Sequence, residues 1–157
     1  MRIREYRPAD FNELWRLDQE CFPPGIAYSR FELMHYIRRQ GSFTLVAEAD
    51  GETICGFVVG ECRTGVRTRN HGRGTVGHVV TIDVPASMRR AGWGTLLMDA
   101  AEAKMRDRDC EVAYLETAVN NAAAIAFYKG RGYTLLSTIP RYYAGNLDAF
   151  VMGKKLI

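Results

Sequence analysis

The run His78-Val79-Val80-Thr81-Ile82-Asp83-Val84 is followed, after a short connection, by Arg89-Arg90-Ala91-Gly92-Trp93-Gly94-Thr95. The first run is rich in β-branched residues and stops at Pro85, so we predict a central strand over 75–84. Apolar positions then predict a helix over 92–107. Glycines at a helix start let the chain turn tightly and let an anion approach free backbone N–H groups. The two arginines add positive charge, so this strand–turn–helix junction is a candidate polyphosphate site.

This junction has a second interpretation, a plain connection with a solvated arginine pair, and spacing alone weighs the two equally. It lacks the Gly-Lys-Ser/Thr of a P-loop, and leucine at position 97 replaces the third glycine of a dinucleotide fingerprint. Gly72-Arg73-Gly74-Thr75-Val76-Gly77 matches that fingerprint in letters. Because it precedes a β-branched run and not a helix, we reject a dinucleotide site there. We predict instead a flexible hairpin loop over 63–74.

Outward from the junction, strands and helices alternate within one domain spanning residues 1–157. Ser29-Arg30-Phe31-Glu32 is a capping box that predicts a helix start, and Asp50-Gly51 predicts a hairpin turn. The expected order, β-α-α-β-β-β-α-β-α-β-β, indicates an α/β fold with a mixed sheet and helices on both faces. The expected strands are 2–6, 43–49, 53–62, 75–84, 112–118, 133–139 and 149–156; the expected helices are 8–21, 29–39, 92–107 and 121–131.

The composition excludes several classes of protein. The chain has 157 residues, of which 47% are apolar and 25% charged, which is unlike disordered, collagen-like or disulfide-scaffold proteins. A net charge of +3 is too balanced to indicate a nucleic-acid or membrane partner. The four cysteines lack metal-ligand spacing, so we expect buried thiols and no metal. The N-terminus lacks the apolar segment of a signal peptide, and no apolar run is long enough to span a membrane, so we expect a cytoplasmic protein.

The loop predicted over 63–74 is basic. It carries Arg63, Arg67, Arg69 and Arg73 without an acidic residue, and such a segment could attract an acidic substrate or RNA. No aromatic residues interleave with the arginines to stack on bases. We therefore expect a solvated loop and no nucleic-acid partner.

A second block extends the pattern around the glycine turn. Leu115-Glu116 ends a predicted strand, and the following helix carries Asn-x-x-Ala-x-x-x-Tyr from Asn121 to Tyr128, then Gly132-Tyr133. Together with Arg-x-x-Gly-x-Gly at 89–94, this arrangement resembles the motifs of the GNAT N-acetyltransferases. The ending Arg141-Tyr142-Tyr143, with Asp148-Ala149 and Met152 downstream, is similar to the ribosomal-protein alanine and related N-terminal acetyltransferases. The resemblance covers nearly the whole chain and implies a GNAT-like, mostly antiparallel twisted sheet.

The resemblance implies acetyl-CoA as co-substrate and places it along the junction. The backbone of Ile82, Asp83 and Val84 would pair with the pantetheine arm as an added strand would. Arg89 would stand at the mouth of the pyrophosphate site. Asn121 would contact the co-substrate, and it also suits the N-cap of its helix. The backbone N–H groups that would hold the pyrophosphate belong to Arg90, Ala91, Gly92, Trp93, Gly94 and Thr95.

The resemblance also implies three catalytic side chains. A free α-amine has a pKa near 8, so a base must take its proton, and Glu116 matches the family's base. Tyr128 matches the acid that protonates the departing thiolate, and a backbone N–H near Val84 is available to the oxyanion. His78 is a second candidate base, since its usual pKa lies near neutrality. Each has a structural alternative: Glu116 as an arginine partner, Tyr128 as a helix-face aromatic, and His78 as a strand residue satisfied by a neighbour.

We predict an N-acetyltransferase whose acceptor is a protein N-terminal amine. Ile26, Tyr28, Tyr142 and Tyr143 fall at positions that line the peptide groove in the resembling enzymes. Pro23-Pro24-Gly25 departs from the ribosomal-protein branch, which leaves the first acceptor residue open. The alternatives are a polyamine or antibiotic acetyltransferase, favoured by an acidic pocket, and a non-catalytic acyl-CoA-binding module, which would need neither Glu116 nor Tyr128. A monomer or a homodimer is expected.

Overall fold

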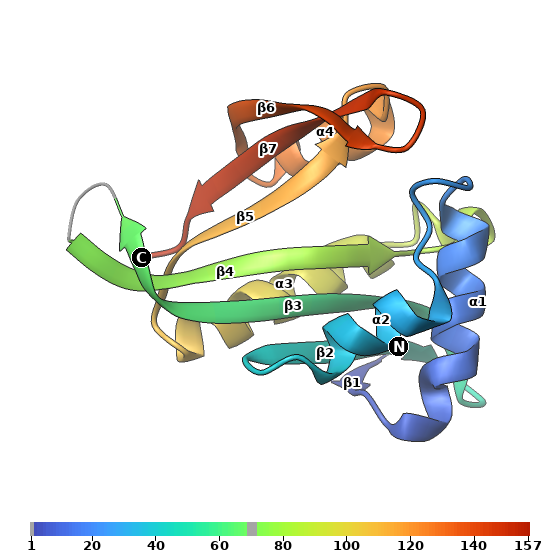
Figure 1. The fold of residues 1–157 in the computed structure, drawn as a ribbon. Helices are drawn as coiled ribbons and strands as arrows, with labels where there is room; N and C mark the ends of the chain where they lie inside the picture. The colour runs from blue at the N-terminus through green and yellow to red at the C-terminus, as the bar shows by residue number, and fades with distance from the viewer. Residues whose placement is uncertain (1, 69–71) are drawn as a thin grey trace.

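The computed structural model describes residues 2–68 and 72–157. One seven-stranded sheet runs in the spatial order β1-β2-β3-β4-β5-β7-β6, with helices on both faces (Figure 1). Neighbouring strands are antiparallel except for the parallel pair β4 and β5, so the predicted fold class is confirmed. The strands are β1 (Arg2–Glu5), β2 (Ser42–Ala49), β3 (Thr53–Thr68), β4 (Gly72–Asp83), β5 (Cys110–Ala118), β6 (Thr134–Tyr143) and β7 (Leu147–Lys155). The helices are α1 (Phe11–Cys21), α2 (Arg30–Arg38), α3 (Trp93–Asp107) and α4 (Ala122–Gly130), with single 3₁₀ turns at Pro8–Asp10 and Ala86–Met88.

The core has one layer on each face of the sheet. Under α1 and α2, Leu14, Leu17 and Leu33 pack against Phe57 and other residues of β2 and β3. On the opposite face, the apolar side of α3 packs against β2–β5 together with aromatic residues of and beyond α4. The alternation of side chains along a strand sends successive residues into these two layers. The position of each β4 and β5 residue along its strand therefore decides on which face of the sheet its side chain lies.

Local signals set several boundaries as predicted. Ser29 Oγ accepts from Glu32 N at 3.1 Å, and a Glu32 carboxylate oxygen accepts from Ser29 N at 3.0 Å, which completes the capping box of α2. Gly51 adopts a φ of +79° in the β2–β3 turn, and Gly132 adopts +94° just after α4. Both values lie in the left-handed region that glycine enters without strain.

The hairpin predicted at 63–74 is present, but the extent of its loop was wrong. Most of these residues extend β3 and β4 into a long hairpin, in which Arg63 pairs with Val76 and Arg67 with Arg73. Backbone pairing across the hairpin overrides the glycine signal, and a register irregularity between Arg63 and Val66 accommodates the local mismatch. Arg69, which was counted in the basic segment, lies outside the described residues.

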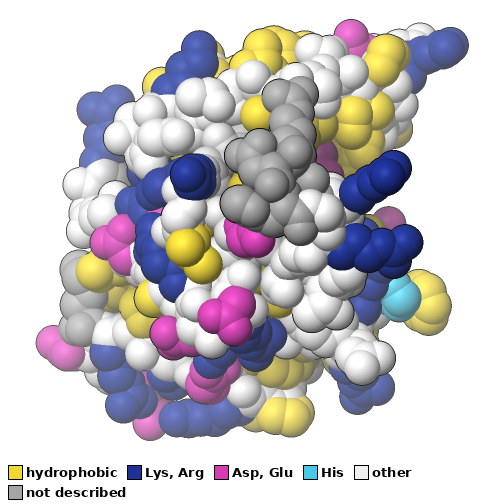
Figure 2. Space-filling view, turned by 90° about the vertical axis from the view of Figure 1, so that its left-hand side faces the viewer, with side chains coloured by type: hydrophobic (Ala, Val, Ile, Leu, Met, Phe, Trp, Pro, Cys, Tyr) yellow, Lys and Arg dark blue, Asp and Glu magenta, His cyan; other side chains and the backbone are white. Residues whose placement is uncertain are grey.

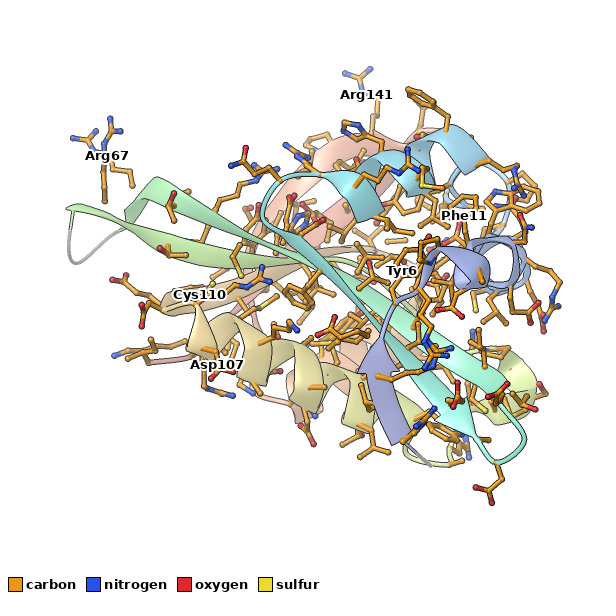
Figure 3. All side chains as sticks on the ribbon, turned by 90° about the horizontal axis from the view of Figure 1, so that it is seen from below. Tyr6, Phe11, Arg67, Asp107, Cys110 and Arg141 are labelled. Carbon is orange, nitrogen blue, oxygen red and sulfur yellow. The ribbon has the colours of Figure 1, made fainter. Side chains whose placement is uncertain are left out.

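The described arginines near this hairpin end, Arg63, Arg67 and Arg73, are exposed. Arg67 projects away from the ribbon (Figure 3). Figure 2, which faces the same end of the molecule, shows basic side chains interspersed with acidic ones. Arg63 is also engaged by Glu61, with its Nη2 2.8 Å from Oε1. The charge on this face is therefore partly balanced by neighbouring acids.

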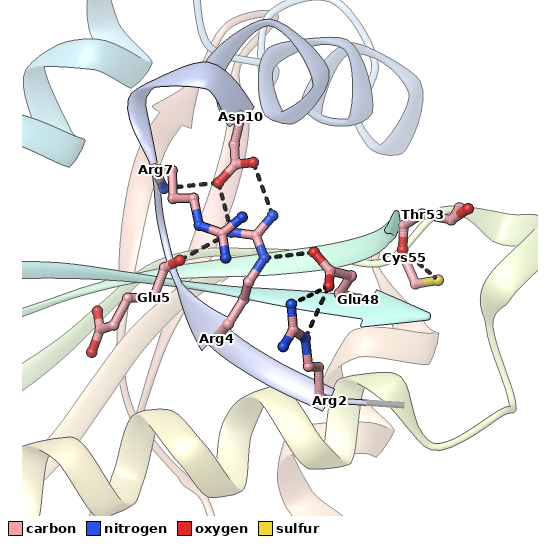
Figure 4. Close-up of polar contacts among 8 residues, drawn as sticks. All are labelled: Arg2, Arg4, Glu5, Arg7, Asp10, Glu48, Thr53 and Cys55. Carbon is pink, nitrogen blue, oxygen red and sulfur yellow. Dashed lines mark hydrogen bonds and ion pairs between the residues drawn. The ribbon is translucent and has the colours of Figure 1, made fainter. Parts of the chain in front are cut away.

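The first strand is held at the sheet edge by a compact ion network (Figure 4). Arg4 contacts Asp10 at 2.8 Å and Glu48 at 2.6 Å, and Arg2 contacts Glu48 at 2.7 Å. Asp10 also accepts from Arg7 N at 2.8 Å, which fixes the turn leading into α1. The four cysteines are free thiols, and no helix among the described residues is long and apolar enough to cross a bilayer.

Candidate active site

The two central strands separate after a short parallel pairing. β4 and β5 are paired from Thr75 with Cys110 to His78 with Tyr114. Beyond these residues β4 continues to Asp83 and β5 to Ala118, but within the described structure the two strands no longer pair with each other (Figure 1). Backbone N–H and C=O groups on the facing edge of β4 are left for another partner.

A β-bulge accompanies this separation. Val59 of β3 pairs with Thr81 of β4, but the adjacent Gly60 pairs with Val79, so Val80 is an extra residue on β4. A bulge bends its strand and increases the local twist. Val80 lies two residues after His78, the last β4 residue that pairs with β5, so the bulge is placed to bend β4 away from its neighbour.

The N-terminus of α3 lies just beyond β4 and has open backbone donors. Gly92 is its N-cap with a φ of +84°, and no side chain caps the helix. The first N–H groups of a helix have no acceptor within the helix, so those of α3 are available to an anion. A Cβ on Gly92 would meet no atom within 4 Å, whereas one on Gly94 would lie 3.4 Å from the Phe127 ring. The junction predicted from the sequence is therefore a strand, an open glycine turn and a helix, as expected.

Charged and polar side chains surround this turn. Arg89 and Arg90 are exposed, and Arg89 Nε donates to Val84 O at 2.9 Å. Asn121 Oδ1 accepts from Ala124 N at 3.1 Å, so Asn121 is the N-cap of α4. Trp93 is buried in the core, so only its backbone is available to a ligand. Ile82, Ala91 and Thr95 complete the stretch predicted to contact the co-substrate.

His78 and Glu116, the two candidate bases, are hydrogen-bonded to each other. Their side chains meet across the β4–β5 pair, with His78 Nε2 2.6 Å from Glu116 Oε2. The other ring nitrogen, Nδ1, lies 3.2 Å from Glu61 Oε1. The imidazole also stacks on the Tyr114 ring at 4.4 Å between centroids. The alternative in which Glu116 pairs with an arginine does not hold among the described residues, because its partner is His78.

The two carboxylates set the charge of the imidazole. Burial would lower the pKa of His78, but the hydrogen bonds to Glu116 and Glu61 outweigh it and raise that pKa above its usual 6.5. The same bond to His78, aided by Arg63 and Arg39, holds the pKa of Glu61 below its usual range. The arrangement Glu61–His78–Glu116 is thus a carboxylate–imidazole–carboxylate chain whose protons belong to the group as a whole.

Tyr128, the candidate acid, lies on α4, the helix that follows β5. Its side chain is buried against Phe127 and Tyr133, with ring centroids 5.4 and 5.8 Å away. Burial raises the pKa of Tyr128 above its usual value of 10, and the nearby Asp83 and Tyr143 raise it further. The phenol therefore keeps its proton at neutral pH and is available as a donor.

The predicted acceptor residues meet in one aromatic surface. Gly25, in the loop between α1 and α2, lies so close to the β6–β7 turn that a Cβ on it would be 3.0 Å from Ala144 Cβ. Tyr142 and Tyr143 are in contact, edge to face, at 4.9 Å between ring centroids. Burial raises the pKa of both phenols, and the nearby charge of Glu116 raises each further.

The loop side of this surface is formed by Tyr28 and Ile26. Tyr28 packs on Tyr36 of α2 at 5.2 Å. Ile26 is partly buried in the same loop, which turns through a hydrogen bond from Ile26 N to Pro23 O at 3.1 Å. The structure thus brings both predicted walls of the acceptor site together beside Glu116.

Comparison with known proteins agrees with this arrangement. The sequence model of the acetyltransferase (GNAT) family matches residues 11–133. The chain belongs to the GNAT family. It is an acetyltransferase, and the alternative of a non-catalytic acyl-CoA-binding module is set aside.

The GNAT relatives include several N-terminal acetyltransferases. An N-alpha-acetyltransferase of Sulfurisphaera tokodaii is 31% identical over 99% of this chain and 93% of the relative. N-alpha-acetyltransferase 30 of Schizosaccharomyces pombe is 30% identical over 78% of each chain. Among solved structures, Ard1 from Thermoplasma volcanium has a TM-score of 0.85 at 26% identity, covering 99% of this chain and 97% of its own. Chaetomium thermophilum Naa20, in complex with a bisubstrate analogue, has a TM-score of 0.81 at 27% identity, covering 99% and 86%.

Two features of this GNAT site were not predicted from the sequence. Glu61, the second carboxylate on His78, stands in the apolar run Phe57-Val58-Val59-Gly60-Glu61, and its alternation with Val59 was the available signal of a buried acid. Asp83 was expected to act through its backbone, yet its side chain is completely buried. Neither role is visible in the spacing, because it depends on which strands become neighbours.

Proposed function

We propose that this chain transfers the acetyl group of acetyl-CoA to the α-amine of a protein N-terminus. One observation carries the proposal: the open end of β4 and β5 has the glycine turn of α3 on one side and the His78–Glu116 pair, with its aromatic surface, on the other. A donor and an acceptor amine would then meet at the same strand from opposite faces of the sheet. The curated relatives named N-alpha-acetyltransferase support the choice of acceptor.

The residues present fit acetyl-CoA as the co-substrate. The open N–H groups from Arg90 to Thr95 would hold the pyrophosphate, because the glycine turn leaves no side chain in the way. The free edge of β4 at Ile82, Asp83 and Val84 would pair with the pantetheine amides. Arg89, and Asn121 through the part of its amide not used in capping, would lie at the two ends of this path. Acetyl-CoA would supply an activated acyl group on a thioester.

Aromatic side chains support a peptide acceptor over a polyamine. Tyr28, Tyr142 and Tyr143 with Ile26 would line the acceptor groove. The acids beside them, Glu116 and Glu61, are both engaged by His78. A polyamine site would need carboxylates free to pair with several ammonium groups.

The proton transfers follow from the side chains on each side. The amine nitrogen forms a bond to the acyl carbon and gives its proton to the His78–Glu116 pair, which accepts it as a unit. A backbone N–H near Val84 stabilises the carbonyl oxygen. The carbon–sulfur bond breaks, and Tyr128 gives its proton to the leaving thiolate. Tyr128 regains a proton from solvent as the products leave.

The test is acetyl transfer to defined amines. The purified chain is incubated with acetyl-CoA and, separately, peptides with free N-termini, the same peptides with blocked N-termini and an internal lysine, and polyamines. We expect mass spectrometry to place the acetyl group on the α-amine of free peptides only. Transfer to polyamines or lysine, with none to free N-termini, would contradict the proposal.

A further inference from the structure

Two aspartates outside the catalytic chain are completely buried next to each other. Asp18 lies on α1 and Asp83 at the end of β4, and the exposed fraction of each is 0%. The two carboxyl groups lie close enough for each to act on the pKa of the other, and each has an oxygen that is buried without a partner among the described residues. Neither is in an ion pair with any residue that the structure describes. A buried charge without a partner is strongly destabilising, so the way this pair is satisfied needs a physical account.

Each carboxyl group has one satisfied oxygen and one left over. Asp18 Oδ2 accepts from Tyr28 N at 2.7 Å, and Asp83 Oδ1 accepts from Thr81 Oγ1 at 2.6 Å. Asp18 Oδ1 and Asp83 Oδ2 have no other partner among the described residues. Two ionised carboxylates cannot hydrogen-bond, whereas one proton between them satisfies both remaining oxygens.

We propose that Asp18 and Asp83 share one proton and together form a positioning pair that ties the acceptor-binding loop to the strand that holds the acyl donor. This inference rests on the proposed function, since it assigns the loop at 22–28 to the acceptor and β4 to the donor. Asp83 is the protonated partner and donates to Asp18, because Asp18 already accepts the backbone N–H of Tyr28, which favours its charged form, whereas among the described residues Asp83 is bonded only by the neutral Thr81 hydroxyl. The shared proton is thus a direct bond between the two substrate sites.

The acceptor side of this pair is unusually well fixed. The backbone of Tyr28 is held by three side chains of α1: Asp18 accepts from its N–H, while Trp15 Nε1 and Gln19 Nε2 donate to its carbonyl oxygen at 3.2 and 2.7 Å. Of these three side chains, Asp18 continues the contact to β4 through Asp83, and the Tyr28 hydroxyl adds a long hydrogen bond of its own to Val80 O of β4 at 3.5 Å. On that side Asp83 directly precedes Val84, so a shift of Asp83 would move the backbone proposed to face the acyl group.

Among the residues that the structure describes, no cation forms an ion pair with Asp18 or Asp83 to stabilise a second negative charge. The titratable groups that interact with Asp18 or Asp83 are Cys21 of α1, Glu32 of α2, Tyr28 of the loop and Tyr128 of α4. Arg89 acts on Cys21, and its Nε is engaged by Val84 O. All four of these partners are neutral or acidic, so the surroundings favour a single charge on the pair.

The first test counts the proton directly. In protein carrying aspartate isotope-labelled at the side-chain carboxyl carbon, the Asp18 and Asp83 resonances are assigned from Asp18→Asn and Asp83→Asn. We expect the Asp83 carbon in the range of a protonated acid at neutral pH. Both carbons in the carboxylate range would overturn the proposal, whether or not the protein acetylates peptides.

The second test separates positioning from mere packing. Asp83→Leu removes the donor, so it should raise KM for the acceptor peptide about tenfold and speed amide exchange at Tyr28. Asp83→Asn keeps a donor toward Asp18 without a titratable proton, so it should restore both quantities. If Asp83→Leu is unfolded, the comparison of Asp83→Asn with wild type still decides, because a large rise in KM for Asp83→Asn would contradict the proposal.

A matched control is Asp10→Asn, a buried carboxyl in the Arg4 network remote from both loops. It should lower thermal stability but leave the acceptor KM and the exchange rate at Tyr28 unchanged. An equal rise in KM for Asp10→Asn would mean that general destabilisation, and not the pair, controls the loop. Absence of peptide acetylation in wild type would reject the proposed function, and the carboxyl resonances would still decide the proton.

Discussion

At the scale of single residues, the imidazole of His78 carries the pH dependence of this site. Its raised pKa comes from Glu116 and Glu61, so removing the charge of Glu61 should lower it. For Glu61→Gln we expect the pKa of His78 to fall and the acid limb of kcat/KM to move to lower pH with it. The chain has only three histidines, so an NMR titration can follow His78 directly.

Wild type and Glu61→Gln are compared in two ways, by their pH–rate profiles and by the pH dependence of their stability. The amine of the substrate also titrates, but it does so equally with both enzymes, so the ratio of their profiles isolates the protein group. A group whose pKa is raised on folding stabilises the protein below its unfolded pKa and loses that stabilisation as pH rises through the folded pKa. Wild type should therefore lose more stability than Glu61→Gln as the pH rises through the His78 titration. An unchanged His78 pKa in Glu61→Gln would contradict the assignment.

The second residue-scale prediction concerns Tyr128. Its phenol keeps its proton because it is buried, so Tyr128→Phe removes the donor while preserving the packing against Phe127 and Tyr133. We expect kcat to fall about 10²-fold and the affinity for acetyl-CoA to change little. The affinity is measured by calorimetry and the rate under conditions in which chemistry is limiting. Wild-type turnover by the variant would show that water or another group protonates the thiolate.

At the scale of secondary-structure elements, the turn into α3 is the feature to test. Gly92 combines a left-handed φ with an open approach to the helix N-terminus. Gly92→Val should weaken CoA binding by about tenfold or more, because the side chain and the altered backbone both obstruct the anion.

Gly51 provides the matched control for Gly92. It has a φ of +79° against +84°, a Cβ there would also meet nothing within 4 Å, and it lies in the β2–β3 turn. Gly51→Val should show the same backbone strain without any loss of CoA affinity. Equal losses in the two variants would assign the effect to strain and reject the anion site.

Sequence reasoning worked best for elements with a local cause. The capping box at Ser29, the turn at Gly51 and the glycine junction before α3 each depend on a few consecutive residues, and each was predicted. The loop extent predicted for 63–74 was wrong because the strand character of this segment depends on pairing between two arms, which outweighs the glycines. The same limit applies to the site: Glu116, His78 and Tyr128 were named as candidates, but the contact of Glu61 with His78 and of Asp18 with Asp83 requires the strand order.

At the scale of the whole molecule, the sheet consists of two parts joined by a short parallel pairing. β1–β4 form one part and β5–β7 the other. Among the described residues, the backbone pairing that joins the two parts runs only from Thr75 with Cys110 to His78 with Tyr114. A ligand seated between their open ends would connect both parts. At 100 times its Kd, acetyl-CoA should raise the free energy of unfolding by about 2.7 kcal/mol.

Amide hydrogen exchange shows which segments acetyl-CoA stabilises. Amide protection should increase along the open end of β4, residues 79–83, and at the start of α3. The β2–β3 turn at Gly51 is remote from the ligand path and should show no added protection beyond the global effect. Protection confined to any other region would place the ligand elsewhere.

The bulge at Val80 also makes β4 sensitive to length. Val79 lies on the α3 face, but Val80 and Thr81 both lie on the α1 face, and from there the alternation is inverted: Asp83 faces α1, while Ile82 and Val84 face α3. The alternation of side chains between the two faces of β4 is therefore interrupted once, at Val80. Deleting Val80 would remove the bulge and leave the other residues on their present faces, because Thr81 would follow Val79 in regular alternation and regular pairing with β3. Ile82 would still face α3 and Asp83 would still face α1, but β4 would lose the local bend. An alignment gap at this position in a distant sequence would thus mark a straighter β4 and a narrower opening beside β5.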